Sequence, residues 1–163
     1  NYTGVSYAIL WIVSVLFVAL LLALLLRFVF CKKLQRSKAP TLAVFAAPAS
    51  ICLSGYLTIS NNPSVVITLF FASFSIILVT FVYFCIFSII IKDKFTPLFS
   101  CFTFPLAIST LACFKFSNWL SQGLSVNWGC AFYIISLIEL AVSSIVILYV
   151  LGCYIFYYNK LID

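Results

Sequence analysis

The chain has 163 residues, of which 66% are hydrophobic and only 7% charged, with a net charge of +6 and a mean hydropathy of +1.27. This composition excludes an ordinary soluble domain, in which about a quarter of the residues are charged. It is typical of a membrane protein, because runs of about 20 apolar residues cross a hydrocarbon core of roughly 30 Å. The runs are continuous rather than alternating, which excludes barrel strands and predicts an all-α polytopic membrane protein.

Five apolar runs predict five transmembrane helices in a single membrane domain that covers residues 1–163. Their approximate bounds are residues 7–30, 41–60, 65–91, 98–116 and 128–158. The third and fifth runs exceed the minimum length, so we expect them to tilt or to project beyond the bilayer. Asn61-Asn62-Pro63-Ser64 favours a tight turn between the second and third runs. The chain begins with Asn and contains no Met, so we expect further residues upstream.

The basic residues indicate the orientation in the membrane. They gather beside alternate ends of the apolar runs, at Arg27, Lys32, Lys33, Arg36, Lys38, Lys92, Lys94 and Lys160. By the positive-inside rule, these ends are cytoplasmic, which predicts a multi-pass cell-membrane protein with its N-terminus outside and its C-terminus in the cytoplasm. Basic residues placed in this way are topology signals, so no nucleic-acid partner is predicted.

A motif occurs twice, 57 residues apart, at the start of the second and fourth runs. P-T-L-A-V-F-A-A-P-A-S-I begins at Pro40, and P-L-F-S-C-F-T-F-P-L-A-I begins at Pro97. The first proline suits a helix start, whereas the second is expected to bend the helix. Bent membrane helices in equivalent positions are typical of the repeats that line pathways in transporters and channels. The alternative is that prolines are simply more frequent in membrane helices, but the motif matches at four positions.

The second and fourth runs are rich in small and hydroxyl-bearing residues, whereas the other three are dominated by large apolar ones. Small residues suit close packing or a lumen, so we predict hairpins of one bent inner helix and one apolar outer helix. The predicted pore-lining residues are Pro48, Ser50, Ser54, Thr103, Pro105 and Ser109. The lining is predicted to carry hydroxyls and neither an acid nor a base, and a neutral lining without acidic residues favours anions over cations. The alternative is that these hydroxyls bond their own helix backbone.

The titratable residues do not predict an enzyme. There is no histidine, there are three carboxylates, and the seven cysteines lack the spacing of metal ligands, so neither a metal nor a cofactor is predicted. Among the carboxylates, only Glu139 lies within an apolar run. An ionisable residue inside the membrane is a functional candidate, here for proton coupling, and the alternative is a structural role at a helix interface.

Two segments resemble the tellurite-resistance/dicarboxylate transporter family, which includes plant slow-type anion channels and sulfite and malate transporters. They are A-P-A-S-I-C-L-S-G-Y-L-T-I-S at residues 47–60 and F-T-F-P-L-A-I-S at residues 102–109. The resemblance covers essentially the whole chain, aligned with the second half of the family. It implies a ten-helix bundle of five hairpins around a central pore, to which this chain contributes helices six to ten and a missing N-terminal half contributes the rest. Family members are often homotrimers.

The resemblance also implies a gate, a phenylalanine on the ninth helix that falls on Phe104. Some relatives have Gly where Pro105 stands, and a proline makes the bend more rigid. The implied function is a channel or transporter that passes small anions or C4-dicarboxylates. A second hypothesis is a proton-coupled exporter of toxic oxyanions such as tellurite or sulfite, or of lipophilic compounds, that uses Glu139. A third is a membrane scaffold without transport, which the repeated bends disfavour.

Overall fold

The computed structural model describes residues 2–30, 43–44, 46–60, 62–92, 96–123 and 125–162. These residues form helices without any strand, which confirms the all-α prediction. The elements are α1 (Tyr2–Phe30), α2 (Ala47–Ile59), α3 (Val65–Lys92), the 3-10 helix η2 (Pro97–Phe102), α4 (Thr103–Gly123) and α5 (Val126–Ile162).

The apolar helices match a membrane environment in length and composition. The stretches Val65–Ser88, Pro97–Gly123 and Val126–Tyr157 are long and apolar enough to cross a membrane, whereas Gly4–Leu20 and Ala47–Ile59 are shorter. The basic residues between the first and second predicted spans lie outside the described residues, so the predicted orientation stays a prediction.

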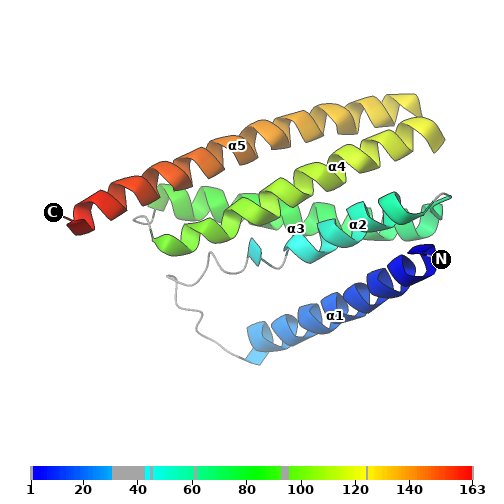
Figure 1. Cartoon of the computed structure of the whole chain (residues 1–163), viewed down its shortest axis with the longest axis horizontal. Helices are drawn as coiled ribbons and strands as arrows, with labels where there is room; N and C mark the ends of the chain where they lie inside the picture. Colours follow the sequence, from blue (N-terminus) through cyan, green and yellow to red (C-terminus); the bar gives the residue numbers. More distant parts are fainter. Residues whose placement is uncertain are drawn as a thin grey trace.

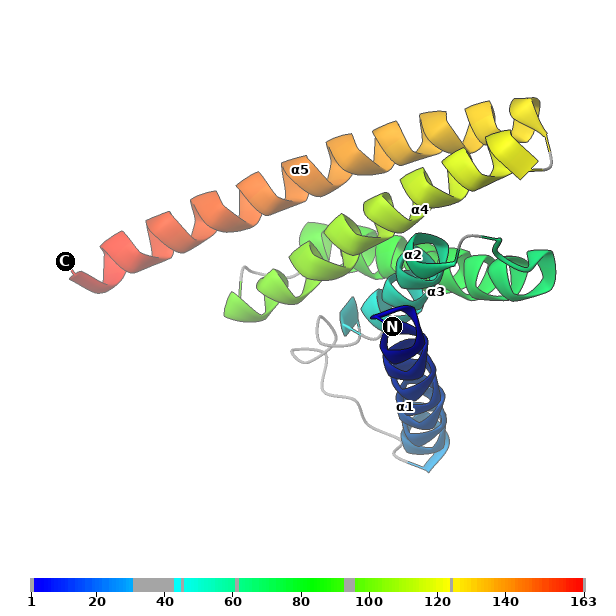
Figure 2. The same cartoon turned by 45° about the vertical axis from the view of Figure 1, so that its right-hand side comes forward.

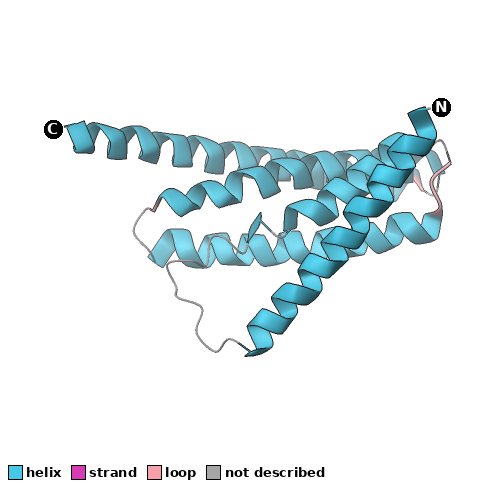
Figure 3. Cartoon of the chain, turned by 60° about the horizontal axis from the view of Figure 1, so that its bottom comes forward, coloured by secondary structure: helices cyan, strands magenta, loops and turns pink. Residues whose placement is uncertain are grey.

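Helices α2, α3, α4 and α5 form a layered bundle, and α1 runs obliquely along its edge (Figures 1, 2 and 3). Helix α4 packs along α5 and α2 packs against α3, while α2 and α4 also contact each other. Helix α1 packs against α2, where Leu10 lies close to Gly55. Helices α2 and α4 are therefore the central pair, and α1, α3 and α5 lie around them.

A single glycine permits the close approach of α5 to the end of α4. A Cβ atom added at Gly129 would lie 1.9 Å from the Ser121 hydroxyl oxygen and 2.8 Å from the Ser121 backbone nitrogen. Carbon atoms do not approach backbone atoms so closely, so a side chain at this position would push the two helices apart. At Gly152, further along α5, an added Cβ would meet nothing within 4 Å.

Two apolar clusters hold the bundle together, one toward each end. The first contains Ala43, Ala46, Val82, Ile86, Phe99, Phe102, Leu106, Val146 and Val150. The second contains Cys52, Leu53, Phe71, Ala72, Ala112, Phe116 and Leu120. Both clusters draw residues from α3 and α4; the second also takes Cys52 and Leu53 from α2, whereas the first takes Ala43 and Ala46 from the segment before α2. Burial of these side chains fixes how α4 and α2 are rotated about their axes.

The motif prolines lie in the first turn of each central α-helix rather than in its middle. Helix α4 begins two residues before Pro105, and α2 begins one residue before Pro48. Residues in 3-10 conformation precede both helices, at 97–102 and at 43–44 and 46. A proline in the first turn lacks only an N–H that has no intrahelical partner, so it is accommodated where each 3-10 segment passes into the α-helix. Consequently the α-helix of the second predicted span covers residues 47–59.

Candidate ion pathway

One face of the central pair is exposed in the part of the chain that the structure describes. Its exposed residues recur every seven positions, which is about two helical turns, so they form a line along each helix. They are Val44, Ile51 and Thr58 on the α2 side and Phe104, Leu111 and Asn118 on α4. We call these six residues the open face. The opposite sides of α2 and α4 pack against α3 and α5. Helix α1 also packs on α2, and Ile51 lines a hollow between these two helices. The open face is the candidate surface for a pathway.

Phe102 and Phe104 of the second motif point in opposite directions. Phe102 is 0% exposed and lies in the first apolar cluster, where its ring meets Phe99 edge to face at a centroid distance of 6.2 Å. Phe104 is 57% exposed and belongs to the open face. Two residues correspond to about 200° of rotation around a helix, which accounts for the reversal. Burial of Phe102 therefore directs Phe104 away from the core.

Four of the predicted pore-lining residues lie inside the packed bundle. Ser50 forms a 2.8 Å hydrogen bond with Ser75 of α3. Ser54 donates to the Ile51 carbonyl at 3.1 Å, and Ser109 donates to the Leu106 carbonyl at 2.9 Å. Pro105 is also buried. The hydroxyls of Ser54 and Ser109 thus bond their own helix, and that of Ser50 bonds a neighbouring helix.

The remaining predicted residues lie at the margin of the open face. Pro48 and Thr103 are half-buried, and the Thr103 hydroxyl donates to the Ser100 carbonyl at 2.8 Å. Of the predicted site residues, the structure therefore brings Phe104 onto the open face, with Pro48 and Thr103 beside it.

Lys115 was missed by the sequence analysis, which took the lining of the second and fourth runs to carry neither an acid nor a base. It lies within the fourth predicted span, 11 residues after Phe104. This separation is about three helical turns and about 16 Å along the axis, so both residues lie on nearly the same side of α4. The signal in the sequence was a basic residue in an apolar run, on the same side of the predicted helix as Phe104.

The Lys115 side chain joins the two central helices beside the open face. Lys115 as a whole is half-buried, and its ammonium group donates a hydrogen bond to the Thr58 hydroxyl of α2 at an exposed position. The Thr58 hydroxyl in turn donates to the Ser54 carbonyl at 2.6 Å. This chain of hydrogen bonds fixes the cation at the point where α2 and α4 meet.

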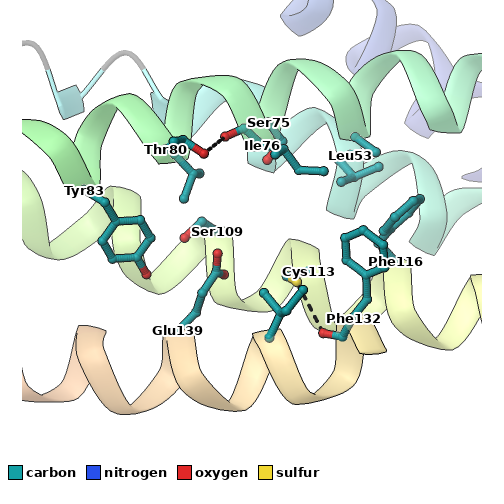
Figure 4. A pocket seen from close by; sticks show the side chains of 13 residues that line it. Leu53, Ser75, Ile76, Thr80, Tyr83, Ser109, Cys113, Phe116, Phe132 and Glu139 are labelled. Atoms are coloured by element: carbon teal, nitrogen blue, oxygen red, sulfur yellow. Dashed lines mark hydrogen bonds between the residues drawn. The ribbon is translucent and has the colours of Figure 1, made fainter. Parts of the chain in front are cut away.

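Glu139 lines a cavity of about 320 Å³ on the opposite side of α4. The cavity lies between α3, α4 and α5, and Figure 4 shows the carboxyl group near Ser109 with the Tyr83 ring facing it. One carboxyl oxygen of Glu139 and the Tyr83 hydroxyl are buried without a hydrogen-bond partner among the described residues. Cys113 also faces this cavity, and its thiol donates to the Phe132 carbonyl at 3.6 Å. The acidic residue is thus separated from the open face by the width of α4.

These features define an all-helical membrane protein in which two central helices present an exposed face with one cation beside it. The model of the voltage-dependent anion channel family matches residues 2–155, so the chain belongs to that family. The match confirms the resemblance drawn from the two motifs and gives a transmembrane channel or transporter for anions. Neither the curated proteins nor the solved structures contain a match to the chain.

Proposed function

We propose that the protein passes small anions through a pore lined by the open face and closed by the ring of Phe104. The observation that supports this proposal is the exposure of Phe104 beside the fully buried Phe102. An apolar ring in a narrow lumen blocks ions because it displaces their hydration shell and offers no ligand in its place. The buried Phe102 holds the first turn of α4 in place, so the gate is a mobile side chain on a fixed helix.

The rest of the pore wall is contributed by other helices. In the ten-helix arrangement implied by the family resemblance, α2 and α4 are inner helices, and α1, α3 and α5 are outer ones. The upstream half then supplies three more inner helices, and three such subunits form the trimer. With the N-terminus outside, Phe104 lies toward the cytoplasmic end of α4 and Lys115 lies toward its outer end.

The charges beside the lumen favour anions. Glu139 is the acidic residue with a described side chain, and it lies on the far side of α4, whereas Lys115 adjoins the open face. A pathway with a cation and no carboxylate attracts anions and repels cations. Small monovalent anions and C4-dicarboxylates are the proposed substrates.

Ion selectivity of the full-length protein tests this function. The Phe104→Ala variant, in which the ring that closes the pore is removed, is reconstituted into a planar bilayer with a tenfold gradient of potassium chloride, and then with potassium malate on one side. We expect a reversal potential close to the chloride equilibrium potential. A reversal potential near that of potassium, or no conductance with any anion, contradicts the proposed function.

The second candidate function is proton-coupled export of oxyanions such as tellurite or sulfite, or of lipophilic compounds. It is favoured by the unpaired Glu139 carboxyl oxygen, which faces a cavity together with Tyr83 and Cys113. A channel with its pathway on the open face requires no proton from this cavity. We therefore expect anion flux between pH 5.5 and 8 to be the same in Glu139→Gln as in the wild type. A pH-dependent flux that loses its pH dependence in Glu139→Gln favours the exporter.

A further inference from the structure

We propose that Lys115 is an anion-binding residue of the pathway, about three turns beyond Phe104, and that Thr58 positions it. The ligand is a singly charged anion such as chloride or nitrate. The proposal rests on the proposed function, because it assigns a binding site to the same pathway.

The hydrogen-bond inventory of the two side chains supports these roles. A lysine ammonium group has three donors, and a threonine hydroxyl has one. Lys115 donates to Thr58, which leaves two ammonium donors for another acceptor. The single hydroxyl proton of Thr58 is already donated to the Ser54 carbonyl. Thr58 therefore orients the lysine but has no donor left for an anion, and the anion is bound by Lys115.

The charges around Lys115 also favour an anion. The described acidic side chain, Glu139, lines the cavity on the other side of α4. Leu111 and Asn118 lie about one turn from Lys115, one on either side of it along the open face, and both are neutral. The ammonium group is therefore the charge that a diffusible anion meets at this level of the open face.

The single charge indicates the substrate class. One ammonium group balances one negative charge, and the neighbouring residues of the open face are neutral. A dicarboxylate would bring a second negative charge to an apolar wall without a cation to compensate it. The site therefore favours monovalent anions over C4-dicarboxylates.

The test measures chloride conductance of the full-length protein as a function of chloride concentration, with every variant made in a Phe104→Ala background so that the pore is open. We expect Lys115→Gln to raise the half-saturating chloride concentration about tenfold, which is the typical effect of losing one charge-assisted hydrogen bond. Lys115→Arg should retain most of the affinity, and Thr58→Val should show an intermediate loss. Ser73→Ala is the matched control, because the Ser73 hydroxyl is exposed and bonds only its own helix at the Leu69 carbonyl.

A second measurement applies even where a variant does not conduct. Binding of an anion to the folded protein raises its unfolding temperature by mass action. In detergent, chloride should therefore stabilise the wild type and Lys115→Arg relative to gluconate, but not Lys115→Gln. If Phe104→Ala conducts chloride and the addition of Lys115→Gln changes neither the half-saturating concentration nor the chloride stabilisation, Lys115 only extends toward the membrane surface and the proposal is wrong. If Phe104→Ala passes no anion, the proposed function itself fails.

Discussion

Phe102 and Phe104 allow a direct comparison of a packing residue with an exposed one on the same turn of helix. Phe102→Ala removes a ring that is 0% exposed and surrounded by the first apolar cluster. Deletion of a fully buried phenylalanine ring costs about 3–5 kcal/mol, because transfer energy is lost and a cavity remains. Phe104 is 57% exposed, so less than half of its surface is removed from solvent. Truncation of Phe104 should lower the free energy of unfolding by about 1 kcal/mol, because the loss scales with the apolar area that is buried.

The assay is thermal or denaturant unfolding of the full-length protein in detergent, with both variants beside the wild type. We expect Phe102→Ala to lose most of the stability margin and to be recovered in lower yield, whereas Phe104→Ala remains close to the wild type. Equal losses in the two variants, or a larger loss for Phe104→Ala, would refute the assignment of Phe102 to the core and of Phe104 to the open face.

Two further predictions concern helix packing and access. Gly129→Ala should lower the free energy of unfolding by about 1–3 kcal/mol, because its new Cβ clashes with the end of α4. Gly152→Ala, where the space is open, should leave stability unchanged in the same unfolding assay, and a similar loss in both would contradict the packing of α5 on α4. Cysteines introduced at Ile51 and Leu111, in a background without the native cysteines, should react with a polar thiol reagent because both lie on the open face. A cysteine at the buried Ser109 should be protected, and labelling of Ser109 alone would reverse the assignment of the two sides of α4.

The helical architecture and the repeat were predictable from sequence because both follow from the placement of apolar residues and prolines. Continuous apolar runs leave the helix as the default structure in lipid. The exact starts of α2 and α4 were not predictable in this way. Pro105 is compatible with a bend in a long helix or with the first turn of a shorter one, and packing of Phe99 and Phe102 selects the second arrangement.

The proposed lining of the pathway was only partly predictable, because residue type does not specify which side of a helix faces a lumen. Ser50 and Ser109 were chosen as small hydroxyl-bearing residues. In the structure, Ser50 is buried and hydrogen-bonds Ser75 of α3 at 2.8 Å, and Ser109 lines the cavity that contains Glu139. Phe104 was predicted from the family resemblance of its motif. Lys115 could have been found by counting helical turns from Phe104. Its contact with Thr58 could not, because the two residues lie 57 positions apart in the chain and meet only when α2 and α4 pack together.

The most direct test of the central claim is the anion conductance of Phe104→Ala in the full-length protein, with Leu111→Ala as the control on the same exposed face. The wild type should pass little current, and removal of the ring should raise anion conductance strongly, because water and ions then fill the space that the ring occupied. Leu111→Ala should change the current much less, since Leu111 lies about two turns from the constriction. A Phe104→Ala protein that reaches the membrane and conducts no more than the wild type would contradict the account.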